Sequence, residues 1–401
     1  MIASNKINVH KERLYESNAV NLLKSAIIYG ANASGKSNFV DVLQFMKHCV
    51  LNDEILYESY NWYCRNHEQN KNQISSFAVR LLIDGDCYEY GFSMALNLRI
   101  IKDEWIVHLN ENRVLYQRNR NGYPYCDFDL GNEERNRMHV YMNDFILNDK
   151  SLFLREMNYN KRFNKNSKLN IFHNIYKWFT EHLRVFKSNT PVTQLTYNFD
   201  ECTLNHMKKI LCSFDLGIED IKTIKMSQEQ LQNKIEISLD NVTMRFENEI
   251  VNVKRKDSGK LDIKTLCLDH GQSMFEYYEE SNGTKRIFDL LDIFLNTNKN
   301  SVYVIDEMER SLHPNLMNRF IELLNEYQKQ SNIQVIFTMH ESSIMKQDLF
   351  RRDQIWFVER DINNDSRMYS LDTFNERFDK QMSKAYLDGR YGAVPCFKPL
   401  F

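Results

Sequence analysis

A glycine-rich stretch at residues 30–37 constrains the fold of this chain more than any other part of the sequence. It reads GANASGKS and fits the pattern G-x-x-x-x-G-K-[ST], in which backbone N–H groups turn inward around phosphate groups. The apolar segment Ala26–Tyr29 precedes it, and apolar residues recur at helical spacing from Phe39 to Val50. A strand, this loop and a helix in that order predict an α/β fold with a nucleotide-binding loop.

The loop predicts contacts with ATP and Mg²⁺, which we expect as the cofactors. The Lys36 ammonium would reach the β- and γ-phosphates, and the Ser37 hydroxyl would hold Mg²⁺. The following helix would present its positive end to the same phosphates. The expected nucleotide-binding residues of the loop are Gly30, Asn32, Ala33, Ser34, Gly35, Lys36, Ser37 and Asn38.

Two acids follow a second apolar strand much farther along the chain. The strand is Val302–Ile305, and Asp306 and Glu307 come directly after it. An acid at the carboxyl end of a buried parallel strand lies at the ligand crevice. We expect Asp306 to bind Mg²⁺ through water and Glu307 to polarise the attacking water. Strand ends are often acidic, so the pattern is weak alone, but its roles complete a phosphoryl-transfer site with the loop.

Two further segments fit the same site. Ser281, Gly283 and Thr284 open a helix before the acidic strand, where they would bind an anion. The alternative for Ser281 is an ordinary helix N-cap. His340 ends the strand Ile336–Met339 and would contact the γ-phosphate and the attacking water, although a lone histidine is more often structural. Glu307 and His340 are therefore the expected catalytic residues.

Strand and helix patterns divide the chain into three expected parts. Residues 1–132 would form the first part of an ATPase head, with an antiparallel β-meander over residues 75–117. Residues 133–235 would form a compact helical lid. Residues 236–401 would complete the head, because strands and helices alternate there as they do around a parallel sheet. The expected class is α/β, with a mixed sheet, a β-meander lobe and an inserted helical lid.

The composition of the chain indicates its cellular compartment and the classes of partner that it could bind. The 401 residues carry a formal net charge of -2, which neither indicates nor excludes a local nucleic-acid site. The eight cysteines form no Cys-x-x-Cys pair and indicate reduced thiols. No apolar run approaches the roughly 20 residues that cross a bilayer, and the first residues lack the apolar core of a signal peptide. We expect a cytoplasmic protein with no membrane contact.

A basic run with an aromatic residue leaves two alternatives open. Lys161, Arg162, Lys165 and Lys168, with Phe163 among them, could contact a nucleic-acid backbone. A solvated lid surface is the alternative that the neutral overall charge favours. Nucleic acid therefore stays an open partner.

The motifs YGANASGKSN, ESNGTKR, VIDEMERSLHP and FTMH, with the tail RRDQIWFVERD and YLDGRYGAVP, resemble a known family. They resemble the abortive-infection AAA-type ATPases of bacterial phage-defence operons, relatives of OLD-family ATPase heads and, more distantly, of SMC and RecF heads. The resemblance covers about residues 10–398, and it is specific in these motifs but not in the expected lid.

The resemblance implies an ATP-hydrolysing dimeric switch. Ser281 and Gly283 would contact the γ-phosphate of ATP held by the opposite subunit, and Leu312–Pro314 would lie at the interface of a homodimer or higher oligomer. ATP binding would control an effector protein from the same operon, such as a nuclease. A DNA-binding repair or clamp ATPase of the RecF and SMC type is the alternative.

The sequence departs from the family in three places. An N-terminal strand pair expected before Met1 is missing, and the glutamine loop that couples the two lobes has no clear position. Too few residues follow His340 for a nuclease domain. We therefore expect any nuclease activity to come from a partner.

Overall fold

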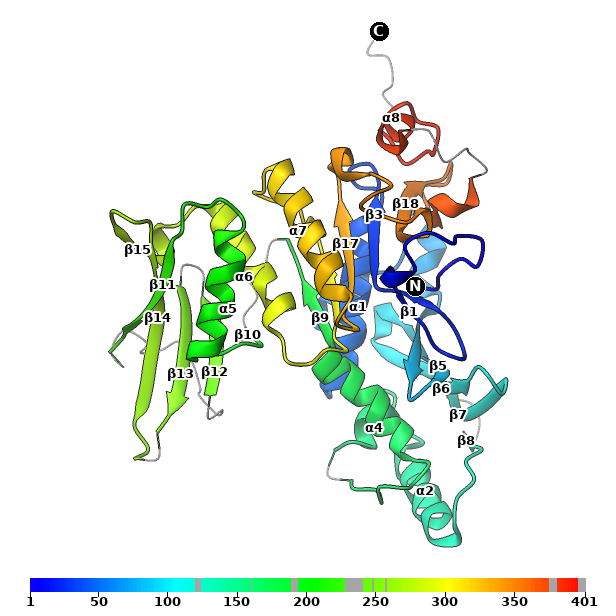
Figure 1. Cartoon of the computed structure of the whole chain (residues 1–401). Coiled ribbons are helices and arrows are strands. Elements are labelled where there is room, and N and C mark those ends of the chain that lie inside the picture. Colours follow the sequence, from blue (N-terminus) through cyan, green and yellow to red (C-terminus); the bar gives the residue numbers. More distant parts are fainter. Residues whose placement is uncertain are drawn as a thin grey trace.

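A six-stranded mixed sheet forms the centre of the part of the chain that the computed structural model describes (Figure 1). The described residues are 1–119, 124–159, 161–188, 194–227, 241–246, 249–256, 258–374 and 381–395. The strands of the sheet are, in spatial order, β19 (Ser366–Ser370), β18 (Ile355–Arg360), β3 (Ser25–Tyr29), β17 (Gln334–Met339), β16 (Val302–Ile305) and β9 (Leu183–Phe186). All neighbours pair in parallel except β19, which is antiparallel to β18.

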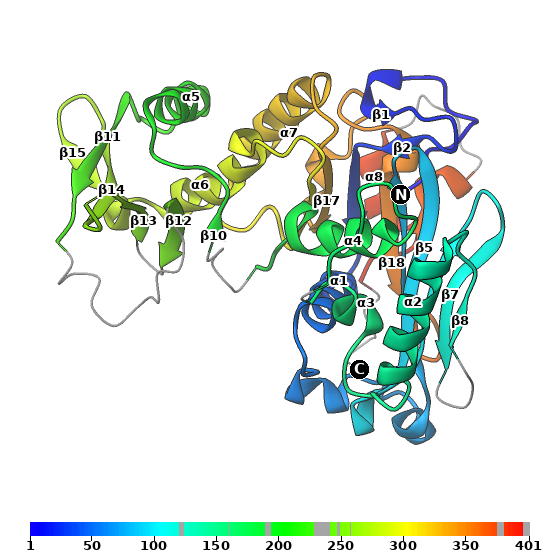
Figure 2. The same cartoon turned by 90° about the horizontal axis from the view of Figure 1, so that it is seen from below.

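Helices cover both faces of this sheet, as its parallel pairing requires. The face that carries Ile27 shares a core with α6 (Asn282–Leu295) and α7 (Pro314–Gln328). The face that carries Val304 shares a core with α1 (Lys36–Leu51). Figures 1 and 2 show α7 and α1 on opposite sides of the sheet. The predicted α/β class with a mixed sheet is confirmed.

The predicted β-meander is also present, beside the central sheet. Its described strands are β4 (Ser75–Ile83), β5 (Asp86–Ala95), β6 (Ile100–His108), β7 (Arg113–Asn119) and β8 (Tyr125–Cys126), each antiparallel to the next. The buried Glu104 of β6 accepts hydrogen bonds from Arg118, Tyr90 and the backbone N–H groups of Phe153 and Leu154. This carboxylate ties the helices that follow the meander to its inner face.

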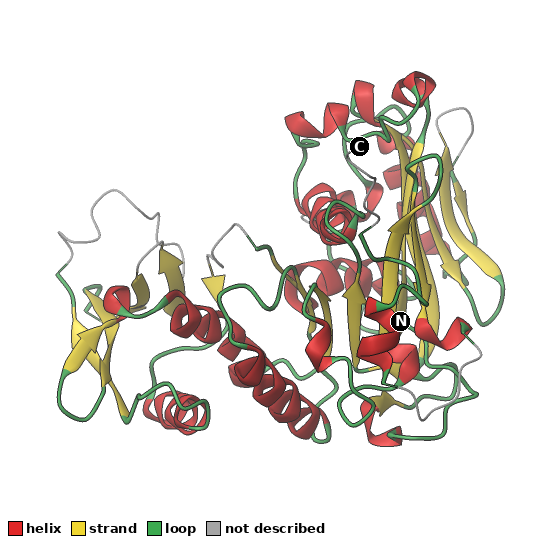
Figure 3. Ribbon diagram, turned by 90° about the horizontal axis from the view of Figure 1, so that it is seen from above, coloured by secondary structure: helices red, strands yellow, loops and turns green. Residues whose placement is uncertain are grey.

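A second lobe extends away from the central sheet, and α6 and α7 lie between the two (Figures 1 and 3). Its described strands are β10 (Gln194–Leu195), β12 (Asn241–Phe246), β13 (Glu249–Arg255), β14 (Leu261–Asp269) and β11 (Asp220–Lys225), with β15 (Met274–Glu276) paired to β14. The helix α5 (Glu201–Cys212) packs on the same lobe and contributes Met207 and Leu211 to the core that also contains α6. The second lobe is therefore mainly a β-sheet with a helix on one face.

This arrangement corrects the expected helical lid over residues 133–235. The helices α2 (Asn132–Phe145), α3 (Phe153–Glu156) and α4 (Asn170–Lys177) share a core with the β-meander instead. Strand β9 belongs to the central sheet, and the second lobe begins after it. A short buried strand lacks the polar alternation that would distinguish it from a helix. Residues 160, 189–193 and 228–235 of the expected lid, and residues 396–398 of the tail, lie outside the described residues.

Several short elements complete the fold. They are β1 (Leu14–Tyr15), β2 (Leu22–Leu23), α8 (Met382–Leu387), a π-helix at Trp178–His182, and 3-10 helices at Lys11–Arg13, Tyr57–Asn61, Glu68–Asn72, Leu96–Leu98, Tyr277–Glu279, Ser342–Ile344, Arg352–Gln354 and Leu371–Thr373. In α8, Tyr386 stacks on Phe357 of β18 with ring centroids 5.4 Å apart. This contact docks the C-terminal tail on the central sheet.

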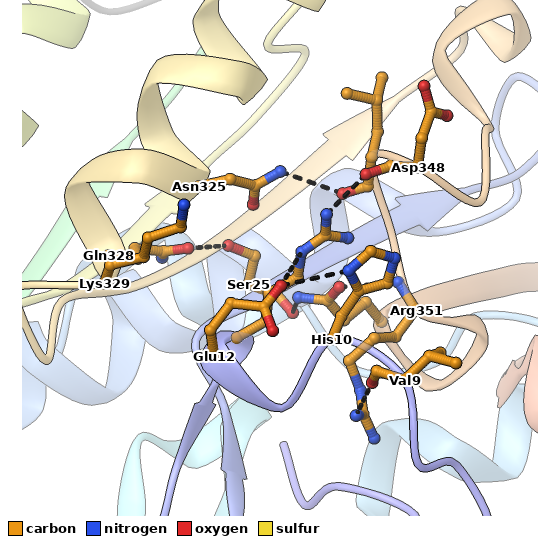
Figure 4. Close-up of polar contacts among 12 residues, drawn as sticks. Val9, His10, Glu12, Ser25, Asn325, Gln328, Lys329, Asp348 and Arg351 are labelled. Carbon is orange, nitrogen blue, oxygen red and sulfur yellow. Dashed lines mark hydrogen bonds and ion pairs between the residues drawn. The ribbon is translucent and has the colours of Figure 1, made fainter.

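The N-terminal segment is held by a buried arginine. The Arg351 side chain is 1% exposed and donates to the carbonyl oxygens of Val9 (2.6 Å) and Ile7 (3.4 Å). It also pairs with Asp353 at 2.8 Å. Figure 4 shows Arg351 reaching Val9, and His10 lying close to Glu12. The Nδ1 atom of His10 and the Oε1 atom of Glu12 are 3.1 Å apart. Arg351 therefore has a structural role.

A buried carboxylate joins α6 to the central sheet, and its removal should destabilise the protein strongly. Asp292 is fully buried and accepts from Thr196 N (2.5 Å), Thr196 Oγ1 (2.8 Å) and Tyr303 Oη (3.0 Å), with Arg184 at 3.4 Å. We expect Asp292→Ala to lower the free energy of unfolding by about 3–5 kcal/mol, since it removes the buried acceptor of Thr196 and Tyr303 and the acidic partner of the half-buried Arg184. Urea unfolding measures this change.

The matched control for this variant is Asp292→Asn, which keeps an acceptor of the same size. It should cost less than the alanine variant because the hydrogen bonds from Thr196 can still form. A loss below about 1 kcal/mol in the alanine variant would contradict this role.

Candidate nucleotide-binding site

The glycines of the loop at residues 30–37 are required by close contacts with β18 and β19 and, at Gly35, by the backbone conformation. A Cβ atom at Gly30 would lie 2.4 Å from the carbonyl oxygen of Val358 in β18. Gly35 has a φ of 110°, and a Cβ there would lie 2.5 Å from Ser366 Oγ. The Ser366 hydroxyl donates to the Ser34 carbonyl oxygen at 2.7 Å. Strands β18 and β19 therefore support the loop from one side.

The lysine of the loop points back into the loop. Lys36 is the first residue of α1, and its Nζ donates to the carbonyl oxygens of Gly30 (2.7 Å) and Ala31 (3.0 Å). The same atom lies 3.4 Å from His340 Nδ1. Burial lowers the pKa of Lys36 to about 8, and the charges of nearby acids, Glu309 first among them, oppose that shift. A phosphate group would supply the negative charge that this partly buried ammonium lacks.

The other residues expected in the loop differ in exposure. Ser34 is buried, and its N–H donates to the Ala31 carbonyl oxygen at 3.2 Å. Asn32, Ala33, Ser37 and Asn38 are exposed. The exposed residues lie in the turn and the first turn of α1, where a ligand on the loop can reach them.

The two motifs that lie far apart in the chain meet in space. Ser37 Oγ donates to Asp306 Oδ1 at 3.3 Å, and Thr338 Oγ1 of β17 donates to the same oxygen at 2.7 Å. Thr338 also accepts the backbone N–H of Glu307 at 2.9 Å. Sequence reasoning missed Thr338, although it is a polar residue directly after the apolar run Val335–Phe337. It fixes the carboxylate of Asp306 beside the first turn of α1.

The hydroxyl–carboxylate pair suits a hydrated divalent cation. Mg²⁺ takes few protein oxygens and completes its octahedron with water and phosphate oxygens, which a serine next to one carboxylate allows. In the described part of the chain, no cluster of three or more His, Cys, Asp or Glu side chains could hold a metal by itself. The donor set therefore fits a cation that arrives with a nucleotide.

The backbone after β16 makes a left-handed turn at Glu307, whose φ is 45°. Such a conformation is unfavourable for a residue with a Cβ and is frequent at functional sites. Arg286 of α6 holds the turn, because its Nη2 donates to the carbonyl oxygens of Asp306 (3.1 Å) and Glu307 (3.2 Å). Burial lowers the pKa of Arg286 to about 10. Sequence reasoning did not identify Arg286, which links the second lobe to the acids.

The histidine after β17 closes one side of the site. His340 lies beside Lys36, and its backbone N–H donates to Glu309 Oε1 at 2.6 Å. Partial burial, and then the charge of Lys36, lower the pKa of His340. The neutral imidazole is therefore favoured and can act as a hydrogen-bond donor and acceptor.

The residues expected to form a signature loop lie at the start of α6. Ser281 is the N-cap, and its Oγ accepts the Thr284 N–H at 3.1 Å and lies 2.9 Å from Thr284 Oγ1. A Cβ at Gly283 would lie 2.8 Å from the carbonyl oxygen of Ser311, so glycine lets α6 approach the segment after Glu307. Ser281 thus acts as the N-cap that was the alternative, and it is also exposed.

The basic run at residues 161–168 and the glutamine loop are two further expectations that the structure bears on. In the basic run, Lys161 pairs with Glu156, and its Nζ lies 4.8 Å from the centre of the Tyr141 ring, which favours a structural role for it. The glutamine loop stays unplaced. Among the described helices, none combines the length and the apolar character needed to cross a membrane.

A family comparison identifies the kind of protein to which this site belongs. The profile described as "AAA domain, putative AbiEii toxin, Type IV TA system" matches residues 25–188 and 201–346, more than half of the chain. The chain belongs to this family. The matched residues of this AAA protein include the loop at 30–37, Ser281, Asp306 and His340. The resemblance to abortive-infection AAA-type ATPases is confirmed, and the protein is a P-loop ATPase of the AAA type.

Comparison with solved structures gives distant matches that include SMC heads. An SMC head bound to the C-terminal winged-helix domain of ScpA is 14% identical, with a TM-score of 0.40 over 88% of this chain and 91% of that one. The Pyrococcus furiosus SMC head bound to the ScpA C-terminal domain is 12% identical, with a TM-score of 0.39 over 88% and 92%. The Thermotoga maritima SMC head is 13% identical, with a TM-score of 0.30 over 89% and 95%. Comparison with curated proteins gave no match.

Proposed function

We propose that this AAA protein binds ATP with Mg²⁺ and hydrolyses it at the site between α1, β16 and β17. One observation carries the proposal: the first turn of α1 meets the acids after β16, with Ser37 Oγ and Asp306 Oδ1 3.3 Å apart. Lysine, hydroxyl and carboxylate in this arrangement are the parts from which phosphoryl-transfer sites are built. Their separation in the sequence makes a chance association of these groups improbable.

Each residue has a distinct task in this proposal. The loop N–H groups and Lys36 would bind the phosphates, which would draw the ammonium away from the carbonyl oxygens of Gly30 and Ala31. Ser37 and Asp306 would hold Mg²⁺, which supplies charge neutralisation at the phosphates. Glu307 would orient and polarise the attacking water, and neutral His340 would hydrogen-bond to that water or to the γ-phosphate.

The proposal extends to a dimer that closes on ATP. Ser281 is exposed at the N-terminus of the long helix α6, where its hydroxyl and the helix end favour an anion. We propose that Ser281, Gly283 and Thr284 contact the γ-phosphate of ATP bound to a second copy. Arg286 joins this helix to the backbone of Asp306 and Glu307, so closure would also act on the acids of the same chain.

The proposed biological role is control of an effector protein by this ATP-driven closure. The description of the matching family names a putative toxin and a toxin–antitoxin system. This description supports a role in bacterial phage defence with a partner from the same operon. A nuclease is one partner that would suit such a switch. We propose a cytoplasmic location, where ATP is abundant.

Phosphate release by the purified chain tests the activity. We expect slow turnover of ATP in the presence of Mg²⁺, because a site completed on closure turns over slowly, and no turnover after chelation with EDTA. Turnover should rise more steeply than in proportion to protein concentration if a dimer is the active form. Release that is absent at every protein concentration, with ATP bound, would contradict hydrolysis.

A further inference from the structure

The segment after β16 carries a third acidic residue, Glu309, whose side chain contacts the backbone of His340. Glu309 follows Asp306 and Glu307, and its Oε1 accepts the backbone N–H of His340 at 2.6 Å. Its own carbonyl oxygen accepts the Leu312 N–H at 2.9 Å, which fixes the turn that carries it. Glu309 thus joins the ends of the adjacent parallel strands β16 and β17.

The second carboxylate oxygen of Glu309 has an unusual environment. Glu309 Oε2 is buried and has no hydrogen-bond partner among the described residues. Burial raises the pKa of this carboxyl above its usual value, while the charge of Lys36 acts against that shift. A buried carboxylate with one hydrogen-bonded oxygen and one unpaired oxygen is energetically unfavourable. Such a group in a native protein therefore calls for a structural or functional explanation.

The hydrogen bond from the His340 N–H gives the other oxygen of this carboxylate, Oε1, a definite role. His340 follows the last residue of β17, so its N–H is no longer held by the sheet. The direction of this peptide group decides where the His340 side chain leaves the backbone, and the imidazole meets Lys36 Nζ at 3.4 Å. An acceptor that holds the N–H therefore also aims the imidazole.

We infer that Glu309 is a positioning residue, which holds His340 over the phosphate-binding loop through its backbone N–H. This inference rests on the proposed function, since it gives His340 its orientation for hydrolysis. Glu309 acts through His340 and does not itself touch ATP or water. Its role needs an acceptor oxygen and not a negative charge.

Two substitutions separate these requirements. Glu309→Gln keeps an acceptor oxygen at the same place, whereas Glu309→Ala removes it. We expect Glu309→Ala to lower kcat on the order of 10- to 100-fold with ATP affinity within about threefold of the wild type, as for other residues that orient a functional side chain. Glu309→Gln should restore kcat to within about threefold of the wild type.

A double-mutant cycle distinguishes positioning from a general loss of structure. In a His340→Ala background, adding Glu309→Ala should lower kcat by less than about twofold, because the side chain that Glu309 aims is gone. An equal loss in both backgrounds, or a glutamine variant as defective as the alanine variant, would overturn the inference.

A second readout does not depend on hydrolysis. Modification of His340 by diethylpyrocarbonate, followed by peptide mass spectrometry, reports how the imidazole is presented. We expect its rate to change at least about threefold in Glu309→Ala and to stay at the wild-type rate in Glu309→Gln. If wild-type protein releases no phosphate, the proposed hydrolysis fails, while this modification rate still decides the role of Glu309. An unchanged rate in Glu309→Ala would overturn it.

Discussion

Replacing Glu307 with glutamine is expected to lower the rate of phosphate release from ATP by about 100-fold or more. Glutamine has nearly the same shape but no charge, so it cannot polarise the attacking water. ATP affinity should change by less than about threefold, because binding relies on the loop and Mg²⁺. Single-turnover phosphate release and ATP titration measure the two effects separately.

The same variant should accumulate as an ATP-dependent dimer. If hydrolysis of ATP reopens the closed dimer, a variant that binds ATP but does not cleave it should remain in the closed dimer. Size-exclusion chromatography with light scattering should then show the dimer mass with ATP and Mg²⁺ and the smaller mass with ADP. A variant that stays monomeric at saturating ATP would contradict the proposed dimeric switch.

Glu322→Gln is the matched control for Glu307→Gln. Glu322 lies exposed on α7, and its Oε2 is 3.4 Å from Arg319 Nη1, so it undergoes the same chemical change away from the site. It should keep wild-type turnover and wild-type mass. If it lost activity to the same degree, the effect at Glu307 would reflect charge removal in general.

The sequence predicted the parts of the fold and site in which local pattern and tertiary structure agree. The strand before Gly30 and the helix after Ser37 were expected because an apolar segment and a helical periodicity flank the glycine motif. Strand Val302–Ile305 was expected because a buried parallel strand is apolar throughout. The alternation from Tyr88 to Met94 predicted a meander strand for the same kind of reason.

The prediction of a helical lid over residues 133–235 was wrong because a short segment within it has an ambiguous hydrophobic pattern. Leu183–Phe186 has only four residues, so neither its length nor its periodicity separates strand from helix. Its place beside β16 depends on pairing with residues far away in the sequence. The pattern therefore predicts a single helical unit, whereas its helices pack on the meander and the chain after β9 enters a second lobe.

The residues that sequence reasoning missed act mainly through the backbone of others. Thr338 accepts the N–H of Glu307, Arg286 donates to the carbonyl oxygens of Asp306 and Glu307, and Glu309 accepts the N–H of His340. Contacts of this kind leave no pattern in the sequence, since the partner atom is the same in every residue type. Only the three-dimensional arrangement identifies them.

The central claim is that Lys36 and the acids after β16 form one nucleotide site. Lys36→Ala removes the only ammonium assigned to the phosphates. We expect it to weaken binding of a non-hydrolysable ATP analogue with Mg²⁺ on the order of 100-fold, the effect of losing charge-assisted hydrogen bonds. Lys329→Ala, an exposed change at the end of α7, should leave binding unaltered.

Isothermal titration calorimetry of the wild type and of Lys36→Ala measures this directly, with thermal unfolding as the check that both chains are folded. The account predicts a clear binding isotherm for the wild type and for Lys329→Ala, and a dissociation constant about 100-fold higher for Lys36→Ala. Equal affinities in a folded Lys36→Ala protein would contradict the claim that the loop at residues 30–37 binds the phosphates.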